Sequence, residues 1–417
     1  MKRPTIARLG WNYNLTWEEG LTANVSRVRE RGGNVIASVQ MSSSMPGMNG
    51  LIHQSQLNLD STRARTEFVR QCEHRVDSTA SPFLDWDEAI QQLSILVLAE
   101  HRKGEPVIKL TGDLPRDRLE WRIKPLIAEG QANVIYGAGG SAKTFMALYM
   151  ACLIDIPWNE NNMDAEPGRV LYLDYETDHH EIDHRIGMIK HGLGVFNETN
   201  ILYRFCSQSV ADDIEALQEL VLEHDINLVI VDSLASASGD EPEKAAPITA
   251  FFMSLRSLRV TSLTLHHVNK ENKLYGNIYI FNQARNIWEI KKSQEEDTAS
   301  LNVGLYHRKA NNGRLFRPLG FKLDFAETSV HVTRKDVMED SELAQHATIR
   351  DQLRAALLHG AMSVAELTEE TKGKAGSIKA ALNHYKALFI PVHQDGAREI
   401  SWGLRQPESS TPRGEPF

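Results

Sequence analysis

The sequence predicts an α/β fold built on a mainly parallel sheet, with a small β-containing module before it and a winged helix-turn-helix unit after it. Two observations lead to this prediction. Between about residues 105 and 335, short apolar runs alternate with helix-forming runs, as in βαβ units. One apolar run is followed directly by a glycine-rich loop and a helix, the order that builds phosphate-binding sites. The 417 residues suffice for two or three domains of about 150 residues each.

Composition and charge exclude several classes of protein. Hydrophobic residues make up 41% and charged residues 24%, which excludes fibrous and wholly disordered chains. The 46 basic and 55 acidic residues give a net charge of −9, so any nucleic-acid site must be local. The 3 cysteines lack a CxxC spacing, which favours a reducing cytoplasm over disulfides or structural zinc. The longest mostly apolar stretch, Phe145–Ile156, is too short to cross a bilayer, and the first residues do not read as a signal peptide, so we expect no membrane contact.

The N-terminal module, residues 1–104, carries no catalytic cluster and is interpreted as a packing or oligomerisation module. Its predicted elements are strands at Leu21–Arg29 and Val35–Val39 around a Gly32-Gly33 turn, then helices at Thr62–Arg75 and Asp85–Arg102.

The central domain, residues 105–335, contains the alternating strands and helices. The expected strands are Ala132–Tyr136, Val170–Asp174, Leu228–Asp232 and Ser262–His266, with Ala284–Ile290 and Leu301–His307 extending the sheet. A crossover helix is expected at Asp212–Glu223. These strands are short and apolar, as burial on both faces requires.

A Walker A phosphate loop is the strongest signal in the chain. It consists of Gly137, Ala138, Gly139, Gly140, Ser141, Ala142, Lys143 and Thr144. Its backbone N–H groups and the following helix N-terminus suit the phosphates of ATP. Lys143 is expected to reach the β- and γ-phosphates, and the Thr144 hydroxyl to bind Mg²⁺. Ala142 stands where the consensus has glycine; we expect helical dihedral angles there, and a methyl group that slows turnover or alters affinity.

Two carboxylates complete the expected hydrolytic site. Asp232 ends an apolar strand as a Walker B aspartate does, and it is expected to hold the Mg²⁺ shell. The next residue is Ser233 rather than glutamate, so the catalytic base must come from elsewhere. Glu176 follows the strand Val170–Asp174, and the carboxyl ends of neighbouring parallel strands meet at one edge of the sheet. We therefore expect Glu176 to activate the attacking water, the alternative being a solvated surface carboxylate.

The order of these motifs resembles the RecA-like ATPases. The phosphate loop is followed by LYLDYE at 171–176, VIVDS at 229–233 and LTLHHVNK at 263–270. Gly276, ARNIW at 284–288 and KANNG at 309–313 follow in turn. Over roughly residues 115–325, this order is similar to the branch that contains the RepA-type hexameric replicative helicases and their mobile-element relatives.

The resemblance assigns further roles by position. It implies that His266 or His267 senses the γ-phosphate, the alternative being a hydrogen-bonded histidine at a strand end. It implies that Arg285 is an arginine finger for the neighbouring subunit, with Lys309 or Arg308 a second trans contact. The alternative for Arg285 is a solvated strand cation. Trans contacts imply activity only in an oligomer.

Two segments have the character of loops that line the central channel of RecA-like rings. Ser233–Pro247 is small and acidic, which suits DNA poorly. Asn269–Tyr279 combines cations with aromatic residues, which suits backbone tracking and base stacking.

The C-terminal unit, residues 343–403, is predicted to be a winged helix. A charged connector at 333–342 precedes it, and 404–417 is predicted to be a disordered tail. The expected elements are a helix at Ala347–Leu358, a capping box at Ser363–Glu366, a recognition helix at Ser377–Leu388 and a wing turning at Asp395-Gly396. Its candidate DNA contacts are Lys372, Lys374, Ser377, Lys379, Asn383 and Lys386. Acidic and basic residues are nearly balanced there, so contact with protein is the alternative.

The predicted function is ATP hydrolysis coupled to DNA, as in a hexameric helicase-type motor acting in replication or recombination of a mobile element. The expected ligands are ATP and Mg²⁺, and the expected partners are single-stranded DNA in the ring, duplex DNA at the winged helix, five further copies of the chain and a replication protein. The alternative is a nucleotide-switched DNA-binding regulator, initiator or helicase loader that hydrolyses ATP slowly. A small-molecule kinase is disfavoured because the chain lacks an Arg-rich lid.

Overall fold

The computed structural model describes residues 1–45, 48, 50–76, 84–104, 107–112, 120–156, 163–240, 244–268, 278–311, 313–392 and 400–405. Contacts divide the chain into two compact units. One contains residues 1–118 and 215–223, and the other contains residues 119–214 and 224–417. No helix among the described residues combines the length and the apolar character that crossing a bilayer requires.

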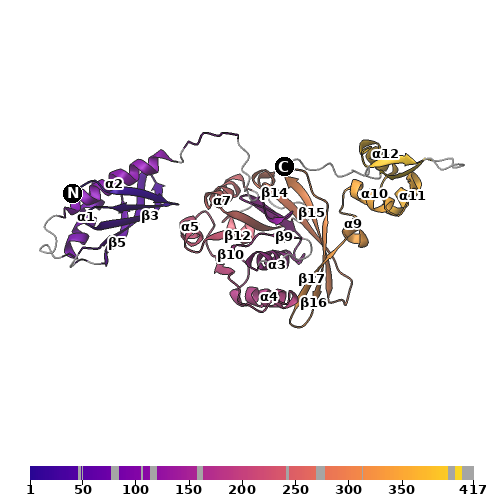
Figure 1. The fold of residues 1–417 in the computed structure, drawn as a ribbon, viewed down its shortest axis with the longest axis horizontal. Helices are drawn as coiled ribbons and strands as arrows, with labels where there is room; N and C mark the ends of the chain where they lie inside the picture. The colour runs from indigo at the N-terminus through magenta and orange to yellow at the C-terminus, as the bar shows by residue number, and fades with distance from the viewer. Residues whose placement is uncertain are drawn as a thin grey trace, which may run out of the picture. The chain divides into compact units, whose positions relative to one another are not determined.

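The N-terminal module is a five-stranded antiparallel sheet packed against two helices (Figure 1). Its elements are β1 (Thr5–Leu9), β2 (Asn12–Thr16), β3 (Leu21–Arg31), β4 (Asn34–Ser43), β5 (Gly50–Asn58), α1 (Thr62–His74) and α2 (Trp86–Lys103). Strict alternation along β4 buries Val35, Ala37, Val39 and Met41 and turns polar residues outward. The predicted hairpin and both helices are present, whereas β5 was not predicted.

The second unit contains a nine-stranded sheet in the order β11-β10-β12-β13-β8-β14-β15-β16-β17. Strands β11 to β14 of that order run parallel, and β14 to β17 are antiparallel. The strands are β8 (Ala132–Gly137), β10 (Arg169–Asp174), β11 (Leu202–Phe205), β12 (Ile226–Asp232), β13 (Thr261–His267), β14 (Asn286–Ser293), β15 (Ser300–Ala310), β16 (Leu319–Phe325) and β17 (Val330–Lys335). A small sheet, β7-β6-β9, is built from β6 (Trp121–Lys124), β7 (Ile127–Ala128) and β9 (Asp164–Ala165). The α/β fold with a mainly parallel sheet is therefore confirmed.

The helices of this unit include α3 (Lys143–Asp155), α4 (His179–Gly192), α6 (Leu234–Ala237), α7 (Ala245–Ser257) and α8 (Ile278–Gln283), whereas nearly all of α5 (Ile214–Glu223) belongs to the first unit. Helix α3 is buried on all sides, since every residue from Met146 to Ile154 is inaccessible to solvent. The apolar stretch Phe145–Ile156 is therefore a core helix. The loop predicted at Ser233–Pro247 is wrong in part, because α6 and the start of α7 occupy it. Most of the second predicted loop, residues 269–277, lies outside the described residues.

The described C-terminal residues form four helices and a three-stranded antiparallel sheet of order β18-β20-β19. The elements are α9 (Ser341–Ala344), α10 (Ile349–Leu357), β18 (Met362–Ser363), α11 (Val364–Thr371), α12 (Ala375–His384), β19 (Phe389–Val392) and β20 (Ser401–Leu404). The capping box is present: Ser363 accepts from the Glu366 N–H, and Glu366 accepts from the Ser363 N–H. The winged-helix interpretation stays a prediction. The Asp395-Gly396 turn and residues 406–417 of the predicted tail lie outside the described residues.

The charged connector predicted at residues 333–342 is instead structured. It contains the end of β17, a 3-10 turn at Val337–Glu339 and the first half of α9. Asp340 caps α9 by accepting from two backbone N–H groups, and it also accepts from the Asn302 side chain at 2.9 Å. Local charge does not prevent order here, because these charged side chains cap helix ends.

Helix α4 packs so closely on β17 that it requires a glycine at its last position. A Cβ added at Gly192 would lie 1.9 Å from the Val330 carbonyl oxygen, whereas one added at Gly187 in the same helix would meet nothing within 4 Å. We expect Gly192→Ala to lower the free energy of unfolding by about 1–3 kcal/mol or more through overpacking. The matched Gly187→Ala should raise it by up to about 1 kcal/mol. Urea unfolding measures both, and equal midpoints would contradict this packing.

Candidate active site

The phosphate loop connects the carboxyl end of β8 to the first turn of α3. Gly137 is required at the end of β8, because a Cβ there would lie 2.5 Å from Ile290 Cγ2 and 2.6 Å from the Ile290 carbonyl oxygen. Gly140 has a φ of +65°, which favours glycine. Glycines at these two positions let the loop backbone turn so that successive N–H groups can bind an anion.

Ala142 does not adopt the helical dihedral angles expected from the sequence. Its φ is 62° and its ψ is 24°, which is the left-handed conformation. The expectation is wrong because Ala142 is the N-cap of α3 rather than its first helical residue, and the loop must reverse direction there. An alanine in this conformation costs about 1–2 kcal/mol, so the loop is locally strained.

Lys143 is buried, and its ammonium group folds back onto the loop. Nζ donates to the carbonyl oxygens of Gly137 at 3.1 Å and Ala138 at 2.8 Å. It also lies 3.4 Å from His267 Nδ1. Burial lowers the pKa of Lys143, and the nearby carboxylates of Asp232 and Glu176 oppose that shift. The loop therefore holds a cation under the position where phosphates bind.

Asp232 and Thr144 meet at the end of β12. Asp232 Oδ2 accepts from Thr144 Oγ1 at 2.7 Å and from the Tyr172 hydroxyl at 2.7 Å. Burial raises the pKa of Asp232, and the two hydrogen bonds act against that rise. The paired hydroxyl and carboxylate oxygens fit Mg²⁺, which takes few protein ligands and completes its shell with phosphate and water. Among the described residues no cluster of three or more His, Cys, Asp or Glu forms another metal site.

Glu176 lies directly beside these groups, at the end of β10. Its Oε1 accepts from Ser233 Oγ at 2.5 Å and lies 3.3 Å from His267 Nε2. The hydrogen bond from His267, then that from Ser233 and the charge of Lys143, lower the pKa of Glu176 to about 2. The carboxyl group is therefore ionised at neutral pH, and its oxygens can accept a hydrogen bond from a water molecule.

His267 connects the two sides of the site. With the proton on Nε2, the ring donates to Glu176 and accepts at Nδ1 from Lys143. His266 is fully buried and extends from the opposite face of β13. Of the two histidines left open by the sequence, His267 is thus the one that touches Lys143 and Glu176.

Two residues that sequence reasoning missed position the carboxylates. Asp174 accepts from the backbone N–H groups of Glu176 and Thr177 at 2.9 and 3.1 Å, which fixes the turn that presents Glu176. Tyr172 orients Asp232 from below. Asp174 is visible in the sequence as an aspartate two residues before Glu176, the spacing of an Asx turn. Nothing in the sequence marks Tyr172, because its role depends on which strand lies beside β12.

A third missed residue is Lys292, which extends β14 past the phosphate loop. Glu289 of β14 pairs with Tyr136 of β8, so Lys292 lies level with the loop that follows β8. A Cβ added at Gly140 would be 3.7 Å from Lys292 Nζ. This exposed ammonium therefore adds a second cation to the phosphate side of the site.

Arg285 and Lys309 lie at the other edge of the same sheet. Asn286 pairs with Asn133 at the start of β8, and Ile287 pairs with Lys309, so both cations lie at the amino end of β14, away from their own phosphate loop. Arg285 is exposed and makes no side-chain hydrogen bond or ion pair with a described residue. The Lys309 ammonium donates to the carbonyl oxygens of Phe281 and Ala284 at the end of α8. Arg308 pairs with Glu289 at 2.7 Å.

Comparisons with known proteins agree with this geometry. Residues 102–273 match the family model described as an AAA domain. A KaiC-like protein from the hyperthermophilic archaeon Pyrococcus horikoshii OT3 is among the similar solved structures, at 15% identity over 54% of this chain and 99% of that chain, with a TM-score of 0.37. No curated protein matches the chain. Residues 102–273 are therefore similar to an AAA domain, and they include the phosphate loop and the strands β8, β10, β12 and β13 that surround it.

The strain at Ala142 is testable by substitution. We expect Ala142→Gly to raise the free energy of unfolding by about 1 kcal/mol, because glycine adopts the left-handed conformation without a Cβ clash. Ala147→Gly, inside α3, is the control and should lower it by about 1 kcal/mol or more. Thermal unfolding without nucleotide measures both. A loss of stability in Ala142→Gly would show that the residue is not strained.

Proposed function

We propose that this chain is an ATP-hydrolysing, DNA-dependent motor of the hexameric helicase type, acting in replication or recombination of a mobile element. The observation that supports this most is the chain of contacts from Lys143 through His267 to Glu176. It joins the group suited to the γ-phosphate to the group suited to the attacking water. The loss of a phosphate is thereby coupled to the end of β13.

Different residues of the site bind the phosphates, hold Mg²⁺ and activate the water. Lys143 and the loop N–H groups bind the phosphates of ATP, while Thr144 and Asp232 hold Mg²⁺. That ion would neutralise charge on the transferring phosphoryl group. Glu176, already ionised and held by Ser233 and His267, orients a water and accepts its proton. Lys309 serves as an end cap for α8 in its own subunit, which leaves Arg285 as the better candidate for contact in trans.

His267 would transmit a change at the phosphate site to the segment that follows β13. It is the last residue of β13, shortly before residues 269–277, where the sequence sets Lys270, Lys273 and Tyr275. These three lie outside the described residues and are proposed to contact single-stranded DNA in the ring. A change in the partners of His267 on hydrolysis would shift the start of that segment.

A nucleotide-switched regulator, initiator or helicase loader is the second candidate. The strained Ala142 favours it, because its methyl group lies next to the phosphate-binding N–H groups and a strained loop suits slow turnover. Such a protein would bind ATP in the same site and unwind nothing.

Steady-state ATP hydrolysis with and without single-stranded DNA separates these candidates. We expect Glu176→Gln to lower the rate at least about a hundredfold, as loss of a general base does, while ATP still binds. Lys143→Ala is the blank, and Ser233→Ala is the control for the hydrogen bond that holds Glu176. Strong stimulation by DNA supports the motor, whereas slow turnover indifferent to DNA supports the switch. Full activity in Glu176→Gln would contradict its assignment as the base.

Contact in trans is testable by mixing variants. Arg285→Ala keeps its own phosphate loop intact, and Glu176→Gln keeps an intact Arg285. Each alone should lose most of its activity, but mixed rings should regain part of it, because some interfaces then combine an intact site with an intact arginine. Lys292→Ala in place of Arg285→Ala is the control and should not be complemented. No recovery in any mixture would place Arg285 outside the neighbouring site.

A further inference from the structure

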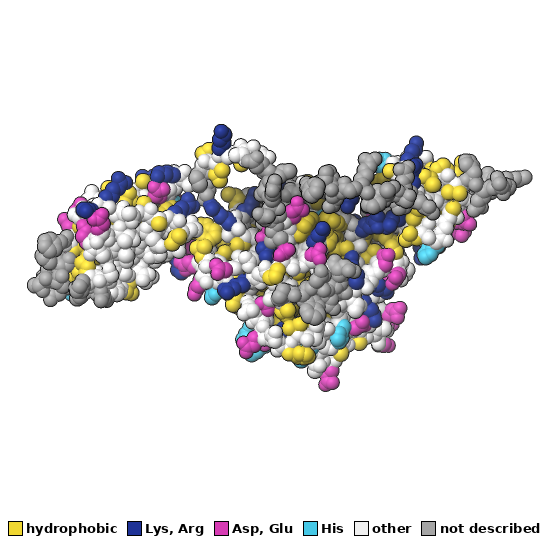
Figure 2. All heavy atoms as spheres, in the orientation of Figure 1, with side chains coloured by type: hydrophobic (Ala, Val, Ile, Leu, Met, Phe, Trp, Pro, Cys, Tyr) yellow, Lys and Arg dark blue, Asp and Glu magenta, His cyan; other side chains and the backbone are white. Residues whose placement is uncertain are grey.

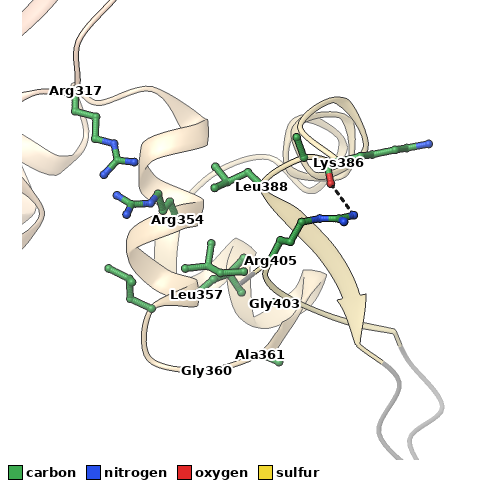
Figure 3. Close-up of a pocket in the computed structure, with 12 residues that line it drawn as sticks. Arg317, Arg354, Leu357, Gly360, Ala361, Lys386, Leu388, Gly403 and Arg405 are labelled. Atoms are coloured by element: carbon green, nitrogen blue, oxygen red, sulfur yellow. Dashed lines mark hydrogen bonds between the residues drawn. The ribbon is translucent and has the colours of Figure 1, made fainter. Parts of the chain in front are cut away.

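Four arginines gather around one hollow beside the ATPase sheet. Arg314 and Arg317 lie on the segment between β15 and β16, and Arg350 and Arg354 lie on α10. We call Arg314, Arg317, Arg350 and Arg354 the arginine cluster. In Figure 3 the side chains of Arg317 and Arg354 point toward each other from these two elements.

The arginine cluster is poorly neutralised by the protein itself. Asp351 is the one carboxylate among the residues that line this hollow, and it already accepts from Thr348 at 2.6 Å and from Arg350 at 3.2 Å. Arg314, Arg317 and Arg354 make no side-chain hydrogen bond or ion pair with any residue in the described part of the chain. Burial is the largest cause that lowers the pKa of Arg317. The positive charges of Arg354, Arg350 and Arg314 lower it further, whereas the charge of Asp351 raises it. Like charges held this close cost free energy unless an anion joins them.

A second hollow continues the first along the C-terminal sheet. Arg317 and Arg354 line both, and Arg405 lies on the far side, where its guanidinium donates to the Lys386 carbonyl oxygen at 3.4 Å. The floor is apolar, with Leu357, Leu388 and Leu404. The result is an open channel with cations along its length. Figure 2 shows dark-blue Lys and Arg side chains gathered toward the C-terminal side of the large unit, with yellow hydrophobic side chains beside them.

We propose that this arginine-lined channel binds the phosphate backbone of DNA. A guanidinium fits phosphate bidentately, and a row of unpaired arginines along an open channel suits a repeating polyanion. The channel meets only the end of the recognition helix predicted from the sequence, because Lys386 and Leu388 line it, whereas the exposed Lys379 of α12 lines neither hollow. The choice of DNA as the polyanion rests on the proposed function. The polyanion-binding character of the channel does not depend on it.

The test measures DNA affinity of the full chain over a range of salt concentrations. Labelled duplex and labelled single strand of equal length are the two probes, read by fluorescence anisotropy. Arg317→Ala with Arg354→Ala should weaken binding at least about tenfold at low salt. It should also reduce the slope of log affinity against log salt by about 1.8 on duplex, since each lost phosphate contact removes about 0.9. The probe with the larger loss identifies the form of DNA that this channel binds.

Two controls keep the proposal falsifiable. Arg317→Lys with Arg354→Lys retains the charge and should keep most of the salt slope, which a merely unfolded variant would not. Lys379→Ala tests the predicted recognition helix and should leave the slope nearly unchanged. The proposal is overturned if the alanine pair binds both probes as the wild type does, or if Lys379→Ala alone removes the affinity. ATP hydrolysis without DNA is measured on each variant, so a failed ATPase assignment is distinguishable from a failed channel.

Discussion

The buried ammonium group of Lys143 is the constraint around which the active site is arranged. A cation inside a protein is costly unless hydrogen bonds and opposite charges surround it. Here two loop carbonyls, a histidine nitrogen and two nearby carboxylates do so. They come from the carboxyl ends of β8, β10, β12 and β13, which a parallel sheet brings to one edge. The same partners that stabilise Lys143 without nucleotide are those that must rearrange when phosphates arrive, so stability and chemistry are coupled at this residue.

The two ends of β14 place two cations at opposite edges of the sheet. β14 runs parallel to β8, so its carboxyl end places Lys292 beside the phosphate loop, while its amino end places Arg285 at the opposite edge. A strand rises about 3.3 Å per residue, so the seven residues between them put these two side chains roughly 23 Å apart. Arg285 therefore cannot reach its own phosphate loop. The neighbouring Lys309 shows that position alone is a weak guide to role, since its ammonium is already bound to the end of α8.

The sequence predicted the strands of the site, because a local pattern of residues determines each of them. The strands that precede or bear Asp232, Glu176 and His267 are apolar runs with a polar end, and their alternation with helices predicts a mainly parallel sheet. It failed where a residue's role depends on a distant partner. Tyr172 matters because β10 lies beside β12, and Ala142 is left-handed because the loop must reverse direction before α3. Strand β5 of the N-terminal module illustrates the same limit, since it was not predicted from the sequence.

The net charge of a whole domain does not indicate where its cations gather on the surface. The chain is acidic overall, and the C-terminal residues are nearly balanced, which argued against DNA contact there. Folding separates these charges. Acidic residues such as Asp340, Glu366 and Asp351 accept hydrogen bonds at helix N-termini, where the helix dipole stabilises them. Four arginines are brought to one hollow from segments more than thirty residues apart, and of these Arg350 alone pairs with a described carboxylate, that of Asp351. A nearly neutral domain can thus present a cationic channel, because some of its carboxylates accept from its own backbone and hydroxyl groups, while three of its guanidinium groups stay available to a polyanion.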